Sequence, residues 1–344
     1  MIMDGSRTVT RFALNILEAE RSIECRADQS VLDACLAAGL PFPYNCRSGE
    51  CGKCVARLIE GEVHHLPGAD PAVFNETHRA QGLLLTCLGY PRSDLTLSVA
   101  MRAESGPAIR EFNTVVQEVR RHGPAVAEVV VRADAPVDYH AGQYFEWVLP
   151  GIAPNRCYSA ANRAGTPRLE FHVRIYEGGR ISGLVSSGRL MAGDILTLRG
   201  PFGTFRLSED DQRPAILVAG GTGLAPIKAL LEDAFARRCP RSLRFFYGTR
   251  RAADLYHTDT MAAWARQHRN FSFIPALSDE PLASSWTGLR SLVTDAIARQ
   301  PTDAFGAEAY LCGPPPMIDA AIGLLERLGV DRTDIRYDKF NPVS

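Results

Sequence analysis

The sequence lacks a strong charge of either sign. Its 38 Lys and Arg residues nearly balance 39 Asp and Glu residues, so the formal net charge is −1. This balance argues against nucleic acid as a partner, because no whole-chain basic field would attract it. Internal repeats and low-complexity tracts are also missing. The length of 344 residues suits two or three domains.

The sequence also lacks a long apolar run. No stretch reaches the roughly 18 residues that a membrane-spanning helix needs. The start, MIMDGSRTVTRF, has neither the apolar core nor the small-residue cleavage site of a signal peptide. We therefore expect a cytoplasmic protein that does not cross a membrane, and a monomer is the default expectation.

A disulfide framework is not expected either. The chain has nine cysteines, an odd number, and a cytosolic setting keeps thiols reduced. Three of the nine lie within residues 46–54, which indicates metal ligation. Cys25 and Cys35 are predicted to be packing residues, because they fall on the faces of an expected strand and helix.

The crowded cysteines follow a specific spacing. Cys46, Cys51 and Cys54 form C-x4-C-x2-C, and Cys87 follows later in the chain. This is the spacing of plant-type [2Fe–2S] ligation, in which four thiolates hold two irons. Gly49 would let the loop turn sharply around the cluster. The alternatives are a four-thiolate zinc site and free buried thiols. Zinc loops favour paired C-x2-C knuckles, and only one such pair is present.

The order of expected elements divides the chain into three blocks and a connection. Residues 1–100 alternate short strands with one helix, which predicts a β-grasp domain. Residues 101–110 contain Gly, Ser and Pro and read as a linker. Residues 111–210 are strand-rich and punctuated by Gly and Pro, which predicts an antiparallel barrel. Residues 211–344 alternate strands and helices, which predicts a doubly wound parallel sheet.

A few elements within these blocks matter for the sites. A helix is expected over 29–38 with Ser30 as its N-cap. Another is expected over 289–298, and the strand 308–312 is expected to be the last parallel strand. Residues 200–203 (GPFG) are expected to form a tight turn.

A four-residue pattern suggests a flavin. Arg156, Tyr158 and Ser159 follow R-x-Y-S at the end of a strand-rich stretch. Arginine can neutralise the pyrophosphate of FAD by bidentate contact. Tyr158 is suited to stack on the isoalloxazine, and Ser159 to hydrogen-bond the N5 edge, where hydride arrives. Alone, the pattern also fits the end of a surface strand.

Two later segments add weight to the FAD hypothesis. His172, Val173 and Arg174 form a strand segment, and Gly179 and Ser182 then open an expected helix. Backbone amides at a helix start, together with the Ser182 hydroxyl, favour an anion such as a phosphate.

A glycine-rich turn suggests a nicotinamide nucleotide. The segment AGGTGLAP, with Gly221, Thr222 and Gly223, follows a strand and opens a helix. Its glycines permit close approach of a pyrophosphate, although Pro226 stands where the usual fingerprint has a third glycine. Arg250 or Arg251 is a candidate to touch a 2′-phosphate; the alternative for either is a solvated charge. These residues leave NADH and NADPH open, and the preference for NADH comes only from the family resemblance given below.

The end of the chain carries two further candidates. Cys312 and Gly313 begin CGPPPM at the carboxyl end of a strand, where open α/β sheets bind ligands. Cys312 is expected near the hydride path; the alternative is a packing residue. Phe340 is expected either to cover the flavin ring or to act as a hydrophobic anchor. Ser159, Cys312 and Phe340 are thus the candidates to touch the reacting atoms.

Together the motifs CRSGECGKC, RCYS, GGRIS, AGGTGLAP and CGPPPM resemble a known family along nearly the whole chain. Their order is that of the one-chain reductase components of bacterial oxygenases, such as those of benzoate, naphthalene and terephthalate dioxygenases and of methane and phenol monooxygenases. The resemblance implies three sets of residues. The cluster ligands would be Cys46, Cys51, Cys54 and Cys87; the FAD residues would be Arg156, Tyr158, Ser159, His172, Arg174, Gly179 and Ser182; the nicotinamide residues would be Gly221, Thr222, Gly223, Cys312 and Gly313.

The resemblance implies hydride transfer from NAD(P)H to FAD, then single-electron steps through the cluster. The acceptor would be a terminal oxygenase component, Rieske-type in the leading hypothesis, or an intermediate ferredoxin. It would dock near Arg47, Glu50 and Lys53 on the cluster loop. The alternatives are a di-iron monooxygenase reductase, a reductase of the CDP-6-deoxyglucoseen type and a non-catalytic binding module.

Overall fold

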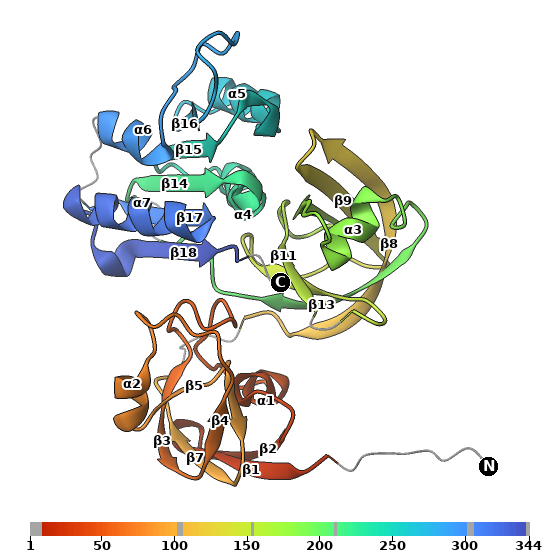
Figure 1. Cartoon of the computed structure of the whole chain (residues 1–344), viewed down its shortest axis with the longest axis vertical. Helices are drawn as coiled ribbons and strands as arrows, with labels where there is room; N and C mark the ends of the chain where they lie inside the picture. Colours follow the sequence, from red (N-terminus) through yellow and green to blue (C-terminus); the bar gives the residue numbers. More distant parts are fainter. Residues whose placement is uncertain (1–8, 102–105, 153–154, 210–211, 301–305, 342–344) are drawn as a thin grey trace. The chain divides into compact units, whose positions relative to one another are not determined.

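The protein, described here by a computed structural model (Figure 1), is defined at residues 9–101, 106–152, 155–209, 212–300 and 306–341. It forms two compact units, Met1–Ile109 and Arg110–Ser344. The predicted linker, 101–110, falls at this division. Its residues 102–105 lie outside the described ranges, and Arg110 already opens a strand.

The first unit is the predicted β-grasp domain. Its five-stranded sheet has the order β2-β1-β7-β3-β5, and β4 pairs with β6 in a small second sheet. The Ser30 side chain accepts a hydrogen bond from the Asp33 backbone N–H and caps α1, as predicted. Cys25 and Cys35 are fully buried, which confirms their packing role. The elements are β1 (Arg11–Ile16), β2 (Arg21–Arg26), α1 (Val31–Ala37), β3 (Val55–Glu60), β4 (Val63–His65), α2 (Glu76–Ala80), β5 (Leu83–Leu85), β6 (Gly89–Pro91) and β7 (Leu95–Ser98).

The second unit begins with the predicted antiparallel barrel. Its six strands have the order β11-β10-β13-β8-β9-β12. A bridge between Ala160 and Phe171 links the two outer strands. The interior is filled by aromatic side chains, among them Phe145 and Trp147. The elements are β8 (Arg110–His122), β9 (Val126–Ala133), β10 (Tyr144–Val148), β11 (Arg156–Ser159), β12 (Arg168–Arg174), α3 (Arg180–Ser186) and β13 (Ile195–Phe202).

One barrel prediction is wrong. The segment 200–203 is not a separate turn, because β13 continues to Phe202, which pairs with Tyr144 of β10. Gly200 serves packing instead. A Cβ there would lie 2.6 Å from Cδ1 of Phe145, so the missing side chain makes room for that ring.

The rest of the second unit is a five-stranded parallel sheet of order β16-β15-β14-β17-β18 (Figure 1). Buried residues of α4 pack on one face of the sheet, and those of α6 and α7 pack on the other. This confirms the doubly wound fold. The elements are β14 (Ala215–Gly220), α4 (Leu224–Ala236), β15 (Leu243–Thr249), α5 (Thr258–Gln267), β16 (Phe271–Leu277), α6 (Val293–Arg299), β17 (Glu308–Gly313), α7 (Pro315–Arg327) and β18 (Ile335–Lys339), with short 3₁₀ turns η2 (Gly221–Gly223) and η3 (Ala252–Asp254).

Two predictions for this sheet need correction. The strand ending at Cys312 is not the last parallel strand, because β18 follows and pairs in parallel with β17. The sequence of β18, IRYDK, is polar, so it gives no apolar run from which a strand could be predicted. An edge strand can be polar because one of its sides is not covered by another strand. The helix expected over 289–298 begins only at Val293, because Leu289 instead forms a bridge with Ala276 of β16.

The barrel and the parallel sheet share one hydrophobic core. Val126 and Phe205 of the barrel pack in the same buried cluster as Leu224 and Cys312. The barrel and the parallel sheet, the two layers of the second unit, are therefore joined by continuous hydrophobic packing. Among the described residues, no helix combines the length and the apolar character that a membrane crossing requires.

Candidate redox site

The fold of the first unit gathers the four predicted cluster cysteines. Strand β3 begins directly after Cys54, and β5 ends just before Thr86 and Cys87. These strands are antiparallel, with Val55 opposite Leu85. The pairing extends past the strands, since the backbone N–H of Thr86 donates to the Cys54 carbonyl at 3.1 Å. Sheet register therefore brings Cys87 to Cys54 from a distant part of the sequence.

The loop from Cys46 to Cys54 is shaped by left-handed backbone. Arg47, Gly49 and Gly52 have φ angles of 58°, 88° and 67°. A Cβ on Gly49 would lie 2.7 Å from Cδ1 of Leu88 and 3.0 Å from Cα of Ala69. Glycine is thus required there for both conformation and space. Four thiols around one such tight loop fit a two-iron cluster.

Arg47 has a structural partner. Its guanidinium lies 2.6 Å from the carboxylate of Asp33 in α1, and the side chain is only 11% exposed. This ion pair fastens the cluster loop to the helix. Arg47 is predicted to contribute to a docking surface, but its guanidinium is largely engaged within the unit.

The four cysteine thiols form two hydrogen-bonded pairs, Cys46 with Cys51 and Cys54 with Cys87. The Cys51 thiol hydrogen-bonds to Cys46 and lowers the pKa of Cys46 to about 5. Cys87 likewise hydrogen-bonds to Cys54 and lowers the pKa of the Cys54 thiol against the effect of burial. Each pair therefore places two sulfur atoms side by side, and a metal ion that takes the place of the protons would bind them as thiolates.

The predicted flavin residues lie along β11, an outer strand of the barrel sheet. Alternation puts Arg156 and Tyr158 on one face and turns Ser159 to the other, where it is buried. The Tyr158 ring packs against Trp147 with ring centroids 4.4 Å apart. Burial raises the pKa of Tyr158, so its hydroxyl stays protonated. The Tyr158 ring, supported by Trp147, is suited to the isoalloxazine of FAD, and Arg156 in the same strand is suited to its pyrophosphate.

The second flavin segment gives a mixed picture. The His172 side chain is buried against Tyr256, whose hydroxyl lies 3.0 Å from Nδ1. This side chain is therefore engaged with the C-terminal part of the unit, and a role for His172 in binding FAD stays a prediction. The Ser182 hydroxyl accepts from the Tyr176 N–H at 3.2 Å and also contacts the Tyr176 carbonyl. Gly179 caps α3, and the roles of both residues stay predictions.

The nucleotide turn lies where the strand order of the parallel sheet reverses. Strands β14 and β17 are neighbours there, and their carboxyl ends carry Gly220 and Gly313. A Cβ on Gly313 would lie 2.8 Å from the Gly220 carbonyl oxygen, and one on Gly223 would lie 2.1 Å from the Cys312 carbonyl oxygen. Close backbone approach at a switch point is the usual setting of a dinucleotide site.

Strand β12 contacts the η2 turn, so the flavin segment and the nucleotide turn meet. Thr222 lies in η2 and is half-buried. The Tyr247 hydroxyl donates to the Gly221 carbonyl at 3.2 Å and holds the turn from β15. Tyr247 was missed in the sequence analysis, because an apolar strand gives no sign of which tyrosine faces a loop.

Cys312 and Phe340 lie beside this turn. Cys312 is fully buried in the shared core, and burial raises the pKa of its thiol far above the usual value. It is therefore a neutral thiol. The Phe340 backbone N–H donates to the Gly313 carbonyl at 2.8 Å, and its ring packs against the shared core. The positions agree with both readings of each residue, so their catalytic roles stay predictions.

Arg250 follows β15 and is exposed. Its neighbour Arg251 pairs loosely with Asp279, at 3.5 Å, and both of those side chains are more than 60% exposed. Both arginines are exposed, and a role in recognising a 2′-phosphate stays a prediction.

Known families match all three parts of the chain. The 2Fe-2S iron-sulfur cluster binding domain matches residues 14–92, the oxidoreductase FAD-binding domain residues 116–207 and the oxidoreductase NAD-binding domain residues 217–322. The reductase subunit of an aromatic O-demethylase from Amycolatopsis is 36% identical over 94% of this chain and 97% of its own length. The chain belongs to the oxygenase reductase components.

Other members of this family extend the likeness. The reductase component DmpP of phenol 2-monooxygenase from Pseudomonas is 33% identical over 92% of this chain and 91% of its own length. The crystal structure of the Amycolatopsis cytochrome P450 reductase GcoB matches with a TM-score of 0.85 and 35% identity, over 97% of this chain and 100% of that one. A ferredoxin reductase in carbazole 1,9a-dioxygenase matches with a TM-score of 0.76 and 29% identity, over 96% and 99%.

This oxygenase reductase component is therefore an NAD(P)H-dependent iron–sulfur flavoprotein that delivers electrons to a terminal oxygenase. When bound, the flavin takes up electrons in pairs and releases them one at a time. The protein supplies orientation. Trp147 packs against Tyr158, Tyr247 holds the η2 turn, and β12 contacts that turn within the shared core.

Proposed function

We propose that this reductase component prefers NADH, holds FAD on β11 and passes single electrons from a cluster on Cys46, Cys51, Cys54 and Cys87 to an oxygenase docked at the cluster loop. The observation that carries the proposal is the convergence of the four cysteines, two pairs of which hydrogen-bond. Two irons need four thiolates, and the 46–54 loop together with Cys87 after β5 supplies them within one small domain.

The order of electron flow is tested with Cys46→Ser. Anaerobic NADH should bleach the flavin absorbance of both wild-type protein and variant. The variant should lose cytochrome c reduction and keep ferricyanide reduction, because ferricyanide takes electrons from the flavin directly. Cys239→Ser, a change of a partly buried thiol away from the loop, is the matched control. If the variant kept both activities, the cluster would not lie downstream of the flavin.

For docking, the structure narrows the candidate residues. Arg47 pairs with Asp33, so Lys53 is the exposed cation of the loop, with Ser48 exposed beside it. We infer that an acidic patch on the oxygenase meets Lys53. Such contacts between partners are transient and weaken with salt.

Charge reversal at Lys53 tests this contact. Lys53→Glu should raise the KM for the oxygenase component about tenfold at low salt. The reduction of the flavin by NADH should stay unchanged. Arg57→Glu, on β3 of the same unit, is the matched control. Equal effects of the two variants would show that total charge matters and the loop does not.

The proposed preference for NADH over NADPH depends on Arg250 and Arg251, which are both exposed. A 2′-phosphate needs a fixed bidentate partner, and Arg251 shares its guanidinium with Asp279 at 3.5 Å in an exposed position. We therefore expect a lower KM for NADH than for NADPH, and Arg250→Ala should leave the NADH value unchanged. A lower KM for NADPH that is lost in Arg250→Ala would contradict this expectation.

The class of the oxygenase stays a prediction, with a Rieske-type acceptor as the leading hypothesis. The relatives serve an aromatic O-demethylase and a phenol monooxygenase, which favours an aromatic substrate. A pull-down with the cluster-loaded protein, followed by spectroscopy of the captured oxygenase, separates Rieske, di-iron and haem acceptors. A cytoplasmic monomer is likewise proposed, and sedimentation tests the oligomeric state.

A further inference from the structure

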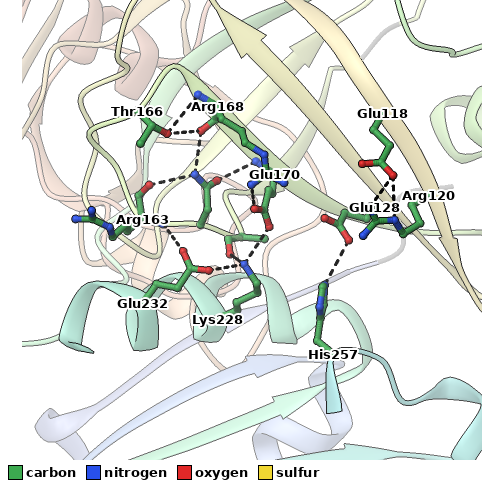
Figure 2. A network of polar contacts seen from close by, with 12 residues as sticks. Glu118, Arg120, Glu128, Arg163, Thr166, Arg168, Glu170, Lys228, Glu232 and His257 are labelled. Carbon is green, nitrogen blue, oxygen red and sulfur yellow. Dashed lines mark hydrogen bonds and ion pairs between the residues drawn. The ribbon is translucent and has the colours of Figure 1, made fainter. Parts of the chain in front are cut away.

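A second group of ligand-type side chains lies outside the residues assigned to the three cofactors. It consists of His122 at the end of β8, Glu128 in β9 and His257 just before α5, and we name it the His–Glu–His cluster. One ligand atom from each residue lies within 4.8 Å of the other two. Figure 2 shows Glu128 of the barrel facing His257 of the C-terminal part.

The spacing of these atoms suits a small metal ion. Bonds of about 2.0–2.1 Å in a tetrahedral zinc site place neighbouring ligand atoms roughly 3.3 Å apart. Oε2 of Glu128 lies 3.4 Å from Nε2 of His257, which already matches. Oε2 lies 2.7 Å from Nε2 of His122, a hydrogen-bond distance. This contact would lengthen when a metal ion replaces the shared proton.

The cluster and the neighbouring His172 contain buried nitrogen atoms without a hydrogen bond. Nε2 of His172 is buried and has no hydrogen-bond partner among the described residues, and the buried Nε2 of His257 has only the 3.4 Å ion-pair contact with Glu128. The two imidazole rings stack with centroids 5.3 Å apart, and His172 is only 4% exposed. Leaving a buried nitrogen unsatisfied is unfavourable, so native proteins rarely keep one without a bound partner such as an ion.

The three ligands are held in place before any ion arrives. The turn between β8 and β9 packs closely on η3, since a Cβ on Gly123 would lie 2.6 Å from the Ala253 carbonyl oxygen. His257 precedes α5, and its side chain makes no capping hydrogen bond to that helix but points to Glu128 instead. The His122 and His257 side chains are 16% and 14% exposed, which leaves a route for an ion from solvent.

We propose that His122, Glu128 and His257 bind a divalent transition-metal ion of the zinc class. Two neutral imidazoles and one carboxylate are a ligand set that zinc prefers. The ion fastens the β8–β9 turn of the barrel to the start of α5. It is separate from the iron of the first unit and stabilises the contact between the two layers of the second unit.

The test uses full-length protein with its iron, sulfide and flavin in place. Zinc is added in excess, free zinc is removed by gel filtration, and zinc and iron are counted in the same sample. One zinc per chain should remain with no loss of iron. The temperature at which flavin is released should rise by about 5 °C, since a ligand that binds only the folded state stabilises it.

His122→Gln and His257→Gln should each lose the bound zinc and the thermal shift. His64→Gln is the matched control, because it makes the same change at an exposed histidine of the first unit. Flavin content and NADH-dependent ferricyanide reduction report whether each variant is folded. Unchanged zinc binding in the two cluster variants, or uptake only with loss of iron, would overturn the proposal. So would absence of binding to the wild-type protein, which would leave the cluster as a hydrogen-bonded contact.

Discussion

The cluster site and the nucleotide site of this protein are specified in different ways. Three of the four predicted cluster cysteines fall within nine consecutive positions, 46–54, and their side chains are themselves the proposed ligands. The nucleotide turn instead depends on backbone from two strands that are far apart in sequence. Gly220 and Gly313 meet only because β14 and β17 are neighbours at the switch point.

The comparison teaches which substitutions each site tolerates. A ligand site fails when one side chain changes, whereas a backbone site fails when a side chain is added. Both sites use glycine, but Gly49 is needed for a left-handed turn, while Gly223 has an ordinary φ of −59° and is needed for space. The predictions below separate these cases, from the largest expected effect to the smallest.

The largest effect is expected at the distant ligand. Cys87→Ser should abolish stable cluster assembly, because three thiolates leave one iron incompletely ligated. Cytochrome c reduction should fall at least about 100-fold, since even outer-shell changes at metal sites cost 10–100-fold. Iron and acid-labile sulfide, measured per flavin, check the cause. Full iron content in the variant would show that Cys87 is not a ligand.

A paired glycine experiment follows at the nucleotide turn. Gly223→Ala forces a Cβ to within 2.1 Å of the Cys312 carbonyl oxygen, whereas a Cβ on Gly221 meets nothing within 4 Å. Gly223→Ala should cost about 3 kcal/mol of unfolding free energy and raise the KM for NADH. Gly221→Ala, strained only by its φ of 55°, should cost about 1 kcal/mol. Denaturant unfolding of both variants measures the difference, and equal costs would contradict the close packing.

An acid-sensitivity experiment tests the core of the parallel sheet. Burial opposes ionisation of Glu308, but hydrogen bonds from Ser208, Arg241 and Arg336 outweigh it and lower its pKa to about 2. A lowered folded-state pKa gives stability that is complete above about pH 5 and is lost as pH falls toward 2. Arg241 is fully buried and lies 2.6 Å from this carboxylate.

Glu308→Gln should therefore lower the unfolding free energy at pH 7 by about 3 kcal/mol, because the buried Arg241 loses its counter-charge. The variant should also show a shallower loss of stability between about pH 5 and pH 3 than wild type. Glu177→Gln, at an exposed carboxylate, is the control. A parallel pH dependence of wild type and Glu308→Gln would refute the assignment.

The smallest effect is expected at the cap of α1. Ser30 accepts a hydrogen bond from the Asp33 N–H at 3.1 Å, so Ser30→Ala should cost about 1 kcal/mol. Ser30→Asp, which keeps an acceptor, should restore most of the loss. Thermal unfolding followed by the visible absorbance of the cluster measures both. No difference between the Ala and Asp variants would show that the cap contributes nothing.

Side chains that must find distant partners were the ones that sequence reasoning missed. Lys228 lies in the apolar segment that forms α4, yet its ammonium is buried 3.0 Å from Glu170 of β12 and 2.6 Å from Glu232 (Figure 2). A lysine within an apolar helical stretch is a signal that could have been noticed. Tyr256 gave none, because its partner His172 lies in another layer of the unit.

The sequence by itself determined the cofactor set and the order of the three parts. Cysteine spacing, glycine turns and apolar periodicity are properties of short segments, so they can be recognised without knowing the tertiary contacts. Tertiary structure alone decided that Arg47 is engaged by Asp33, that Cys312 is buried, that β18 extends the sheet and that two histidines meet Glu128. Those outcomes depend on register and packing between distant segments, which bring groups within a few ångströms only after the core has formed.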